Sequence, residues 1–250
     1  MSDELTFVGH ATVRMELGGA TLLTDPMLRR RFLHVRRYAA APDEQVLAGL
    51  DAVLVSHLHP DHLDFRSLGA LDRDVRFVVP AGGARLIRRR GFHRITELRP
   101  GQATTVGPVE VRATPAVHDG RRLPLGPAVP ALGFDVRSPG SRVYFAGDTG
   151  LFEGMRGLGD GIDVALLPIG GWGPKVGRGH LDARRAAEAA AMLRPRMIVP
   201  IHWGTYLRMG LARTRPELLF EPPRRLAREL AALAPDVALR VLEPGGSLRL

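Results

Sequence analysis

Metal-binding residue types crowd into one short window of this sequence. The segment SHLHPDHLD places His57, His59, Asp61 and His62 directly after the apolar run DAVLVS. The chain has nine histidines in all, and three of them fall within six positions. The packing of a hydrophobic core does not explain such a cluster of polar side chains. If the chain leaves the strand extended, His57 and His59 point to the same side and can reach one cation. Neutral imidazole and carboxylate bind zinc and similar divalent ions, so the window predicts a metal site rather than a polar loop with coincidental histidines.

A pair of cations needs more ligands than this window supplies, so the fold must bring others to it. Three candidates share its context at the end of an apolar run: His118 after VEVRATPAV, Asp148 after RVYFAG, and His202 after MIVPI. Ligands of open sheets bind outside the carboxyl ends of the strands, where successive loops converge. We therefore expect two ligand sets joined by one carboxylate: His57, His59 and His118 for one cation, Asp61, His62 and His202 for the other, and Asp148 between both.

Short apolar runs bounded by Gly, Asp or Pro dominate the first half of the chain, and helical patterns separate the later runs. We expect strands at residues 5–8, 12–17, 21–24, 52–56, 76–79, 109–113, 142–146, 164–168, 197–201 and 238–242. We expect helices at residues 82–90, 182–193 and 223–233, the second capped by Asp182. This mixture predicts sheet layers covered by helices. No linker or repeat divides the sequence, so we expect one domain over residues 1–250.

The composition is that of a globular protein, with 45% hydrophobic and 24% charged residues. The chain has no cysteine, which excludes disulfides, thiolate zinc sites and cysteine nucleophiles. The opening MSDELTF is acidic and has no apolar signal core, and no window reaches the roughly 18 apolar residues of a membrane span. These features predict a cytoplasmic protein without a transmembrane segment.

The net charge of +9 comes almost entirely from arginine, because Lys175 is the only lysine among 35 cationic residues. A basic excess can mark a nucleic-acid or anionic-surface partner, but a compositional bias toward arginine and alanine explains it as well. We expect the arginines at 29–31, 36 and 37 to form solvated faces. Residues 28–33, in MLRRRFL, are the one weak candidate for a contact with a membrane surface.

The pattern HLHPDH followed by distant His, Asp and His resembles the metallo-β-lactamase superfamily. The segments FVGHATVRMELGGATLLTDP, FAGDTG, GHLD, IHWGT and EPP resemble the branch that contains N-acyl-phosphatidylethanolamine phospholipase D and, more distantly, the L-ascorbate-6-phosphate lactonase group. The resemblance implies an α+β fold, a four-layer αββα sandwich with mixed sheets and a two-metal site at their edge. Flavo-di-iron proteins of this fold resemble one another in carrying Glu where this chain has His59, so hydrolysis is favoured over redox chemistry.

The resemblance also implies a hydrolase that uses two divalent ions, with zinc favoured and manganese or iron as alternatives. Metal coordination lowers the pKa of bound water far below its bulk value, toward about 7, which supplies a hydroxide for attack on a small or lipid phosphodiester. A lactone or other cyclic ester is the alternative substrate. A nuclease is less favoured, because the chain has no spare segment for a nucleic-acid-binding module. A non-catalytic binding module is disfavoured because every ligand position holds a competent residue. The oligomeric state stays open.

Two residues are candidates for catalysis. Asp61 would lie beside the hydroxide and accept a proton during attack, in addition to binding metal. His180 precedes the expected cap at Asp182, and the related phospholipase has a histidine at the matching position. Helix N-termini attract phosphate, so we expect His180 to contact the substrate phosphate.

The remaining histidines and one aspartate have supporting or structural interpretations. Asp25 in LLTDP would orient a metal-bound histidine, or would equally well form an Asp-Pro turn. His10 would satisfy backbone groups within the first strands, with a place at the metal edge as the alternative. His34 and His93 lie beside arginines without metal-ligand spacing and are expected on the surface.

Overall fold

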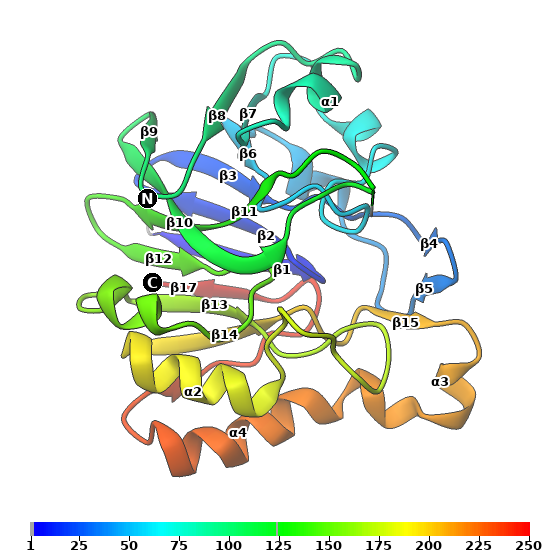
Figure 1. Ribbon diagram of the computed structural model, residues 1–250, viewed down its shortest axis with the longest axis vertical. Helices are drawn as coiled ribbons and strands as arrows, with labels where there is room; N and C mark the ends of the chain where they lie inside the picture. Colours follow the sequence, from blue (N-terminus) through cyan, green and yellow to red (C-terminus); the bar gives the residue numbers. More distant parts are fainter. Residues whose placement is uncertain (1–2, 124) are drawn as a thin grey trace.

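The computed structural model describes residues 3–123 and 125–250, so the first two residues of MSDELTF lie outside it. Two seven-stranded sheets pack face to face, and helices cover the outer face of each (Figure 1). Both sheets contain parallel and antiparallel pairs. The architecture is the α+β sandwich with mixed sheets that the sequence predicted.

The first sheet carries the N-terminal part of the chain and its last strand. Its strands in spatial order are β17 (Ser247–Arg249), β1 (Glu4–Gly9), β2 (Thr12–Leu17), β3 (Ala20–Thr24), β6 (Ala52–Leu54), β7 (Arg76–Pro80) and β8 (Ile95–Leu98). Pairing is antiparallel from β17 to β3 and parallel from β3 to β8. Helix α1 (Ala84–Arg88) covers the outer face, where Ile87 and Phe92 pack on Phe77 and Val79.

The second sheet is antiparallel at one side and parallel at the other. Its strands in spatial order are β16 (Ala238–Leu239), β14 (Met197–Ile201), β13 (Val164–Pro168), β12 (Arg142–Phe145), β11 (Pro130–Arg137), β10 (Val109–Asp119) and β9 (Ala103–Val106). Helices α2 (Ala183–Leu193) and α4 (Glu221–Leu233) cover its outer face (Figure 1). The predicted cap of α2 is confirmed, because the Asp182 carboxylate accepts a hydrogen bond from the Arg185 backbone N–H at 2.9 Å.

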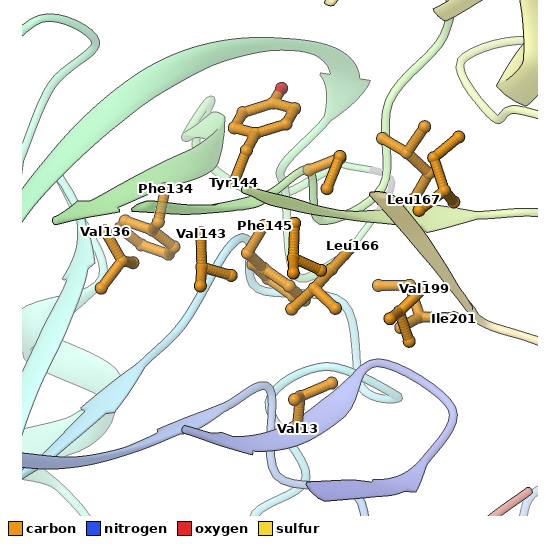
Figure 2. Close-up of a cluster of buried hydrophobic side chains, with 14 of the residues drawn as sticks. Val13, Phe134, Val136, Val143, Tyr144, Phe145, Leu166, Leu167, Val199 and Ile201 are labelled. Carbon is orange, nitrogen blue, oxygen red and sulfur yellow. The ribbon is translucent and has the colours of Figure 1, made fainter. Parts of the chain in front are cut away.

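The main core fills the space between the two sheets. Figure 2 shows Val143 and Phe145 of β12 pointing toward Val13 of β2, while Tyr144 points to the opposite side of its sheet. This alternation follows from the two-residue period of a strand. All four side chains are buried, so both faces of β12 are covered. Burial on both faces explains why this strand reads as a continuous apolar run.

Strand β11 was not predicted, because Pro130 and Gly133 interrupt its apolar pattern. The strand pairs with β10 on one side and β12 on the other, and this pairing overrides its weak local propensity. A Cβ atom at Gly133 would lie 2.5 Å from Thr114 Oγ1 and 3.0 Å from the Phe145 carbonyl oxygen. Glycine is therefore needed where the neighbouring strands approach most closely. Strands β8, β9 and β17 were also missed, and β16 ends at Leu239 rather than at residue 242.

A small third sheet lies beside the sandwich, at the right of Figure 1. It consists of β4 (Arg31–Phe32), β5 (Val35–Arg37) and β15 (Tyr206–Arg208), and α3 (Leu211–Thr214) follows it. The structure adds detail to one expectation here and contradicts another. Leu28 is half-buried and Phe32 is buried, so Leu33 alone of these apolar side chains is exposed, and the membrane contact stays a prediction. Arg37 is also buried rather than solvated, and it donates to the Val8 carbonyl at 2.6 Å.

Within residues 3–123 and 125–250, none of the helices has both the length and the apolar character that a membrane crossing requires.

Candidate metal centre

The ends of two strands bring together the first group of predicted ligands. His57 and His59 follow β6, and His118 lies next to the last residue of β10. The Nδ1 atom of His59 lies 3.0 Å from His57 Nε2 and 3.1 Å from His118 Nε2. Tetrahedral zinc with Zn–N distances of about 2.0–2.1 Å would hold its nitrogen ligands roughly 3.3 Å apart. The spacing of the three nitrogens therefore suits one cation.

The second group lies beside the first. His202 comes directly after β14, and its Nε2 atom lies 3.8 Å from Asp61 Oδ2. The Nε2 atom of His62 lies 3.5 Å from the same oxygen. The ligand atoms of these three residues and of His10 all lie within 4.8 Å of one another.

Asp148 lies where the two groups meet. Its Oδ2 atom is 3.2 Å from His62 Nε2, and its Oδ1 atom is 3.4 Å from His202 Nε2. It also forms a compact set with His118 and His180, in which the ligand atoms lie within 4.8 Å of one another. The structure thus brings together all seven side chains that the sequence singled out as metal ligands.

Gly147, in FAGDTG, allows Asp148 to lie close to the loop that follows β6. Gly147 has a φ of 59°, and a Cβ atom there would lie 2.7 Å from the Cβ atom of Ser56. A larger residue would push the loop after β12 away from the loop after β6.

Backbone carbonyls fix the orientation of two imidazoles. His118 Nδ1 lies 2.9 Å from the Gly179 carbonyl oxygen, and His202 Nδ1 lies 3.0 Å from the Gly170 carbonyl oxygen. A carbonyl only accepts, so Nδ1 carries the proton in both rings and Nε2 presents its lone pair to the cluster. Metal-binding histidines are commonly oriented in this way.

Asp25 orients one imidazole of each group. Its carboxylate is fully buried and lies 2.7 Å from His62 Nδ1. It also accepts hydrogen bonds from the Ser56 hydroxyl at 2.6 Å and from the Ser56 N–H at 2.7 Å. The Ser56 oxygen in turn lies 2.9 Å from His57 Nδ1. The carboxylate therefore faces the histidines rather than the backbone of its own Asp-Pro turn, and Ser56 is a supporting residue that sequence reasoning missed.

The His10 ring lies in the cluster and does not serve the backbone of the first strands. Its Nε2 atom is 3.0 Å from Asp61 Oδ2, and its ring centroid is 3.9 Å from that of His202. Its backbone groups bond separately, to Thr205 Oγ1 and to the His202 N–H. His34 and His93 are exposed, as expected.

The electrostatics of the cluster suit a cation. Burial opposes ionisation of Asp61 and Asp148, but the adjacent imidazoles outweigh it and hold both pKa values well below the usual range. Burial lowers the pKa of His57 far below its usual value and that of His118 to about 4. His57 and His118 are thus held in the neutral form that binds metal. Burial opposes protonation of His62, but Asp148, Asp61 and Asp25 outweigh it and raise the pKa of His62 well above the usual value, so His62 would release a proton on binding a cation.

Three polar atoms at the centre of the cluster are buried without a hydrogen-bond partner among the described residues: His62 Nε2, Asp148 Oδ1 and His202 Nε2. Buried polar atoms are rarely left unpaired, so these three atoms fit the coordination of a cation. All three belong to residues that the sequence predicted as ligands.

A cavity of about 600 Å³ opens over the cluster. His59, Asp61, Asp148, His180 and His202 line it on the metal side. The loop at residues 171–177 lines the other side, together with Arg208 of β15. His180 lies at the cavity with its Nε2 atom 3.4 Å from Asp148 Oδ2. Sequence reasoning noted Lys175 only as a matter of composition and missed its place in this wall, as it missed that of Arg208.

Comparison with known proteins agrees with this geometry. The chain matches the β-lactamase superfamily domain over residues 20–203. A metal-dependent hydrolase of Opitutus terrae is 34% identical over 253 residues, which cover 98% of each chain. This chain belongs to the metallo-β-lactamase superfamily. It is a metal-dependent hydrolase of that superfamily, and its buried histidines and aspartates are suited to metal binding.

Two further proteins extend the comparison. The solved structure of Igni18, a metallo hydrolase of Ignicoccus hospitalis, is 26% identical with a TM-score of 0.72 and covers 100% of this chain and 99% of its own. N-acyl-phosphatidylethanolamine-hydrolyzing phospholipase D 1 of Caenorhabditis elegans is 31% identical over 227 residues, which are 80% of this chain and 64% of that protein.

The Asp25 network predicts that Asp25→Asn weakens metal binding without unfolding the chain. The neutral amide is a poorer acceptor for His62 and Ser56, so the affinity for zinc should fall by about 10- to 100-fold in a chelator competition. Asp135→Asn is the matched control, because Asp135 is a buried carboxylate held by Arg137 and Arg142, outside the cluster. Equal zinc affinities for the parent and Asp25→Asn would contradict the role of Asp25.

Proposed function

We propose that this metal-dependent hydrolase is a phosphodiesterase with two zinc ions per chain. One ion would be held by His57, His59 and His118, and the other by Asp61, His62 and His202, with Asp148 contacting both. Support comes from the two adjoining ligand groups and from the position of Asp148 between them. Its oxygens lie 3.2 Å and 3.4 Å from His62 and His202 of the second group, and its ligand atom lies within 4.8 Å of that of His118 in the first. Imidazole and carboxylate also accept manganese or iron, so zinc is the part of the proposal that metal analysis must test.

The charge of the residues that line the cavity is the basis for proposing a phosphodiester rather than a lactone as the substrate. Lys175 and Arg208 are the only Lys or Arg side chains among its lining residues, and Asp61 and Asp148 are the only acids. Both acids belong to the proposed metal centre, so the rest of the wall presents positive charge. Such a wall favours an anionic phosphodiester over a neutral lactone, because lysine and arginine pair with phosphate oxygens. The relative from Caenorhabditis elegans is named for the hydrolysis of a phospholipid, which supports the same chemical class.

Two cations bound here would ionise a water molecule at neutral pH and draw charge from the phosphoryl oxygen. Within the chain, Asp61 Oδ2 faces this centre and is held by His10 at 3.0 Å, a position from which it can accept a proton during attack. His180 lines the cavity and would contact the substrate phosphate. Trp172 and Val176 give the opposite wall an apolar surface for the ester group.

The direct test measures metal content and hydrolysis on the same preparation. Zinc-loaded protein should contain about two zinc ions per chain and should hydrolyse bis(p-nitrophenyl) phosphate faster than a neutral lactone. Asp148→Ala removes the shared carboxylate, so its kcat/KM should fall at least 100-fold. Faster hydrolysis of the lactone would replace the proposed substrate class, and a zinc-replete protein without bound zinc would overturn the proposal.

The cationic wall predicts a loss of affinity that depends on substrate charge. The double variant Lys175→Met and Arg208→Met should raise KM for an anionic phosphodiester about tenfold, because two side chains that attract phosphate are lost. Turnover of a neutral ester should stay within twofold of the parent. Arg213→Met is the control, since Arg213 is exposed on α3 and does not line the cavity. A change of equal size for both substrates would show that the Lys175 and Arg208 side chains do not select substrates by charge.

A further inference from the structure

Arg122 joins the two chain segments that carry the first ligand group. Its Nη1 atom donates to the Leu58 carbonyl at 3.2 Å and to the Leu63 carbonyl at 2.5 Å. These two carbonyls lie on either side of residues 59–62, which hold three of the predicted ligands. The Leu58 N–H donates in return to the Gly120 carbonyl at 3.1 Å. The segment that follows His118 therefore makes hydrogen bonds to both ends of the loop at residues 58–63.

The side chain of Arg122 packs against the protein rather than extending into solvent. Its guanidinium lies 4.1 Å from the centroid of the Phe65 ring and is half-buried. Burial lowers the pKa of Arg122 to about 10, so the group remains charged at neutral pH. The nearby Asp64 carboxylate pairs with Arg29 at 2.6 Å instead. A charged donor makes stronger hydrogen bonds to carbonyls than a neutral one, so these contacts hold the loop firmly.

We propose that Arg122 is a positioning residue for the metal centre. By its contacts with the backbone, Arg122 sets the spacing between His118 and the loop that carries His57 and His59. This inference rests on the proposed metal centre. Arg122 touches neither a ligand atom nor the cavity, and it acts through the backbone of Leu58 and Leu63. Small shifts of that backbone would change the 3.0 Å and 3.1 Å separations at His59 Nδ1.

Arg90 offers a matched control. Its guanidinium lies 4.0 Å from the centroid of the same Phe65 ring, but among the described residues its side chain makes no hydrogen bond to the loop. Arg90→Met therefore removes a cation from the ring and leaves the loop contacts in place. Arg122→Met removes both the cation and the hydrogen bonds to the loop. Arg122→Lys keeps a charged donor that can restore part of this hydrogen bonding.

The experiment measures zinc affinity by chelator competition, the visible spectrum of the cobalt-substituted protein, and the unfolding midpoint of the metal-free protein. Arg122→Met should bind zinc about tenfold more weakly than the parent and show an altered cobalt spectrum, Arg122→Lys should be intermediate, and Arg90→Met should stay within twofold. The spectrum reports ligand geometry, which a loss of fold stability alone would not change.

Unchanged zinc affinity and cobalt spectrum in Arg122→Met would overturn the inference, as would equal losses in Arg122→Met and Arg90→Met. If Arg122→Met does not fold, Arg122→Lys against Arg90→Met decides, and equal affinities would overturn it. A parent protein that binds no zinc would instead overturn the metal centre, so the two failures are distinguishable.

Discussion

Three buried carboxylates crowd around one imidazole, and this charge must be compensated for the chain to fold as it does. His62 contacts Asp25 through Nδ1 at 2.7 Å, and its Nε2 atom lies 3.2 Å from Asp148 and 3.5 Å from Asp61. Burying an ionised carboxylate is costly unless it is paired or binds a cation. The neighbouring imidazoles hold the pKa values of Asp61 and Asp148 well below the usual range, whereas burial raises that of Asp25. The His62 imidazolium offers a single positive charge to these acids. Divalent cations between the neighbouring imidazoles would supply the rest, so the cluster and the sandwich edge that holds it are best understood as a metal centre.

The backbone around this cluster is strained in a way that agrees with a functional site. Six non-glycine residues of the described chain have positive φ angles, and three of them are His10, Asp25 and His202. Such conformations cost free energy and persist where the surroundings impose them. At His10 and His202 the strained backbone accompanies side chains that lie in the cluster, with the ring centroids 3.9 Å apart. The fold thus accepts local strain where several strand ends must deliver side chains to one place.

Much of the architecture could be predicted because its signals are local. The apolar runs that become β6, β10, β12 and β14 are each followed by histidine or aspartate, and ligands of open sheets bind outside the carboxyl ends of the strands. The cap of α2 at Asp182 is likewise a local signal. Strand β11 could not be found in this way, because Gly133 is explained only by the approach of Thr114 and Phe145 from neighbouring strands.

The surroundings of the site depend on contacts between distant segments. Ser56 was read only as the end of a strand, although it links Asp25 to His57. The orientation of His10 depends on its positive φ angle, which no pattern announces. Lys175 and Arg208 line the same cavity from positions 33 residues apart, and no spacing rule connects them. The sequence could therefore predict the ligands of the proposed centre and offer Asp25 as a residue that orients one of them, but it could not predict Ser56, Lys175 or Arg208.

The central claim is that one pair of cations lies between the strand ends, and diffraction from zinc-replete crystals tests it most directly. Data collected on both sides of the zinc absorption edge should show two anomalous peaks per chain. One peak is expected between His57, His59 and His118, and the other between Asp61, His62 and His202, with Asp148 in contact with both. A single peak, no peak, or peaks held by other residues would contradict the account.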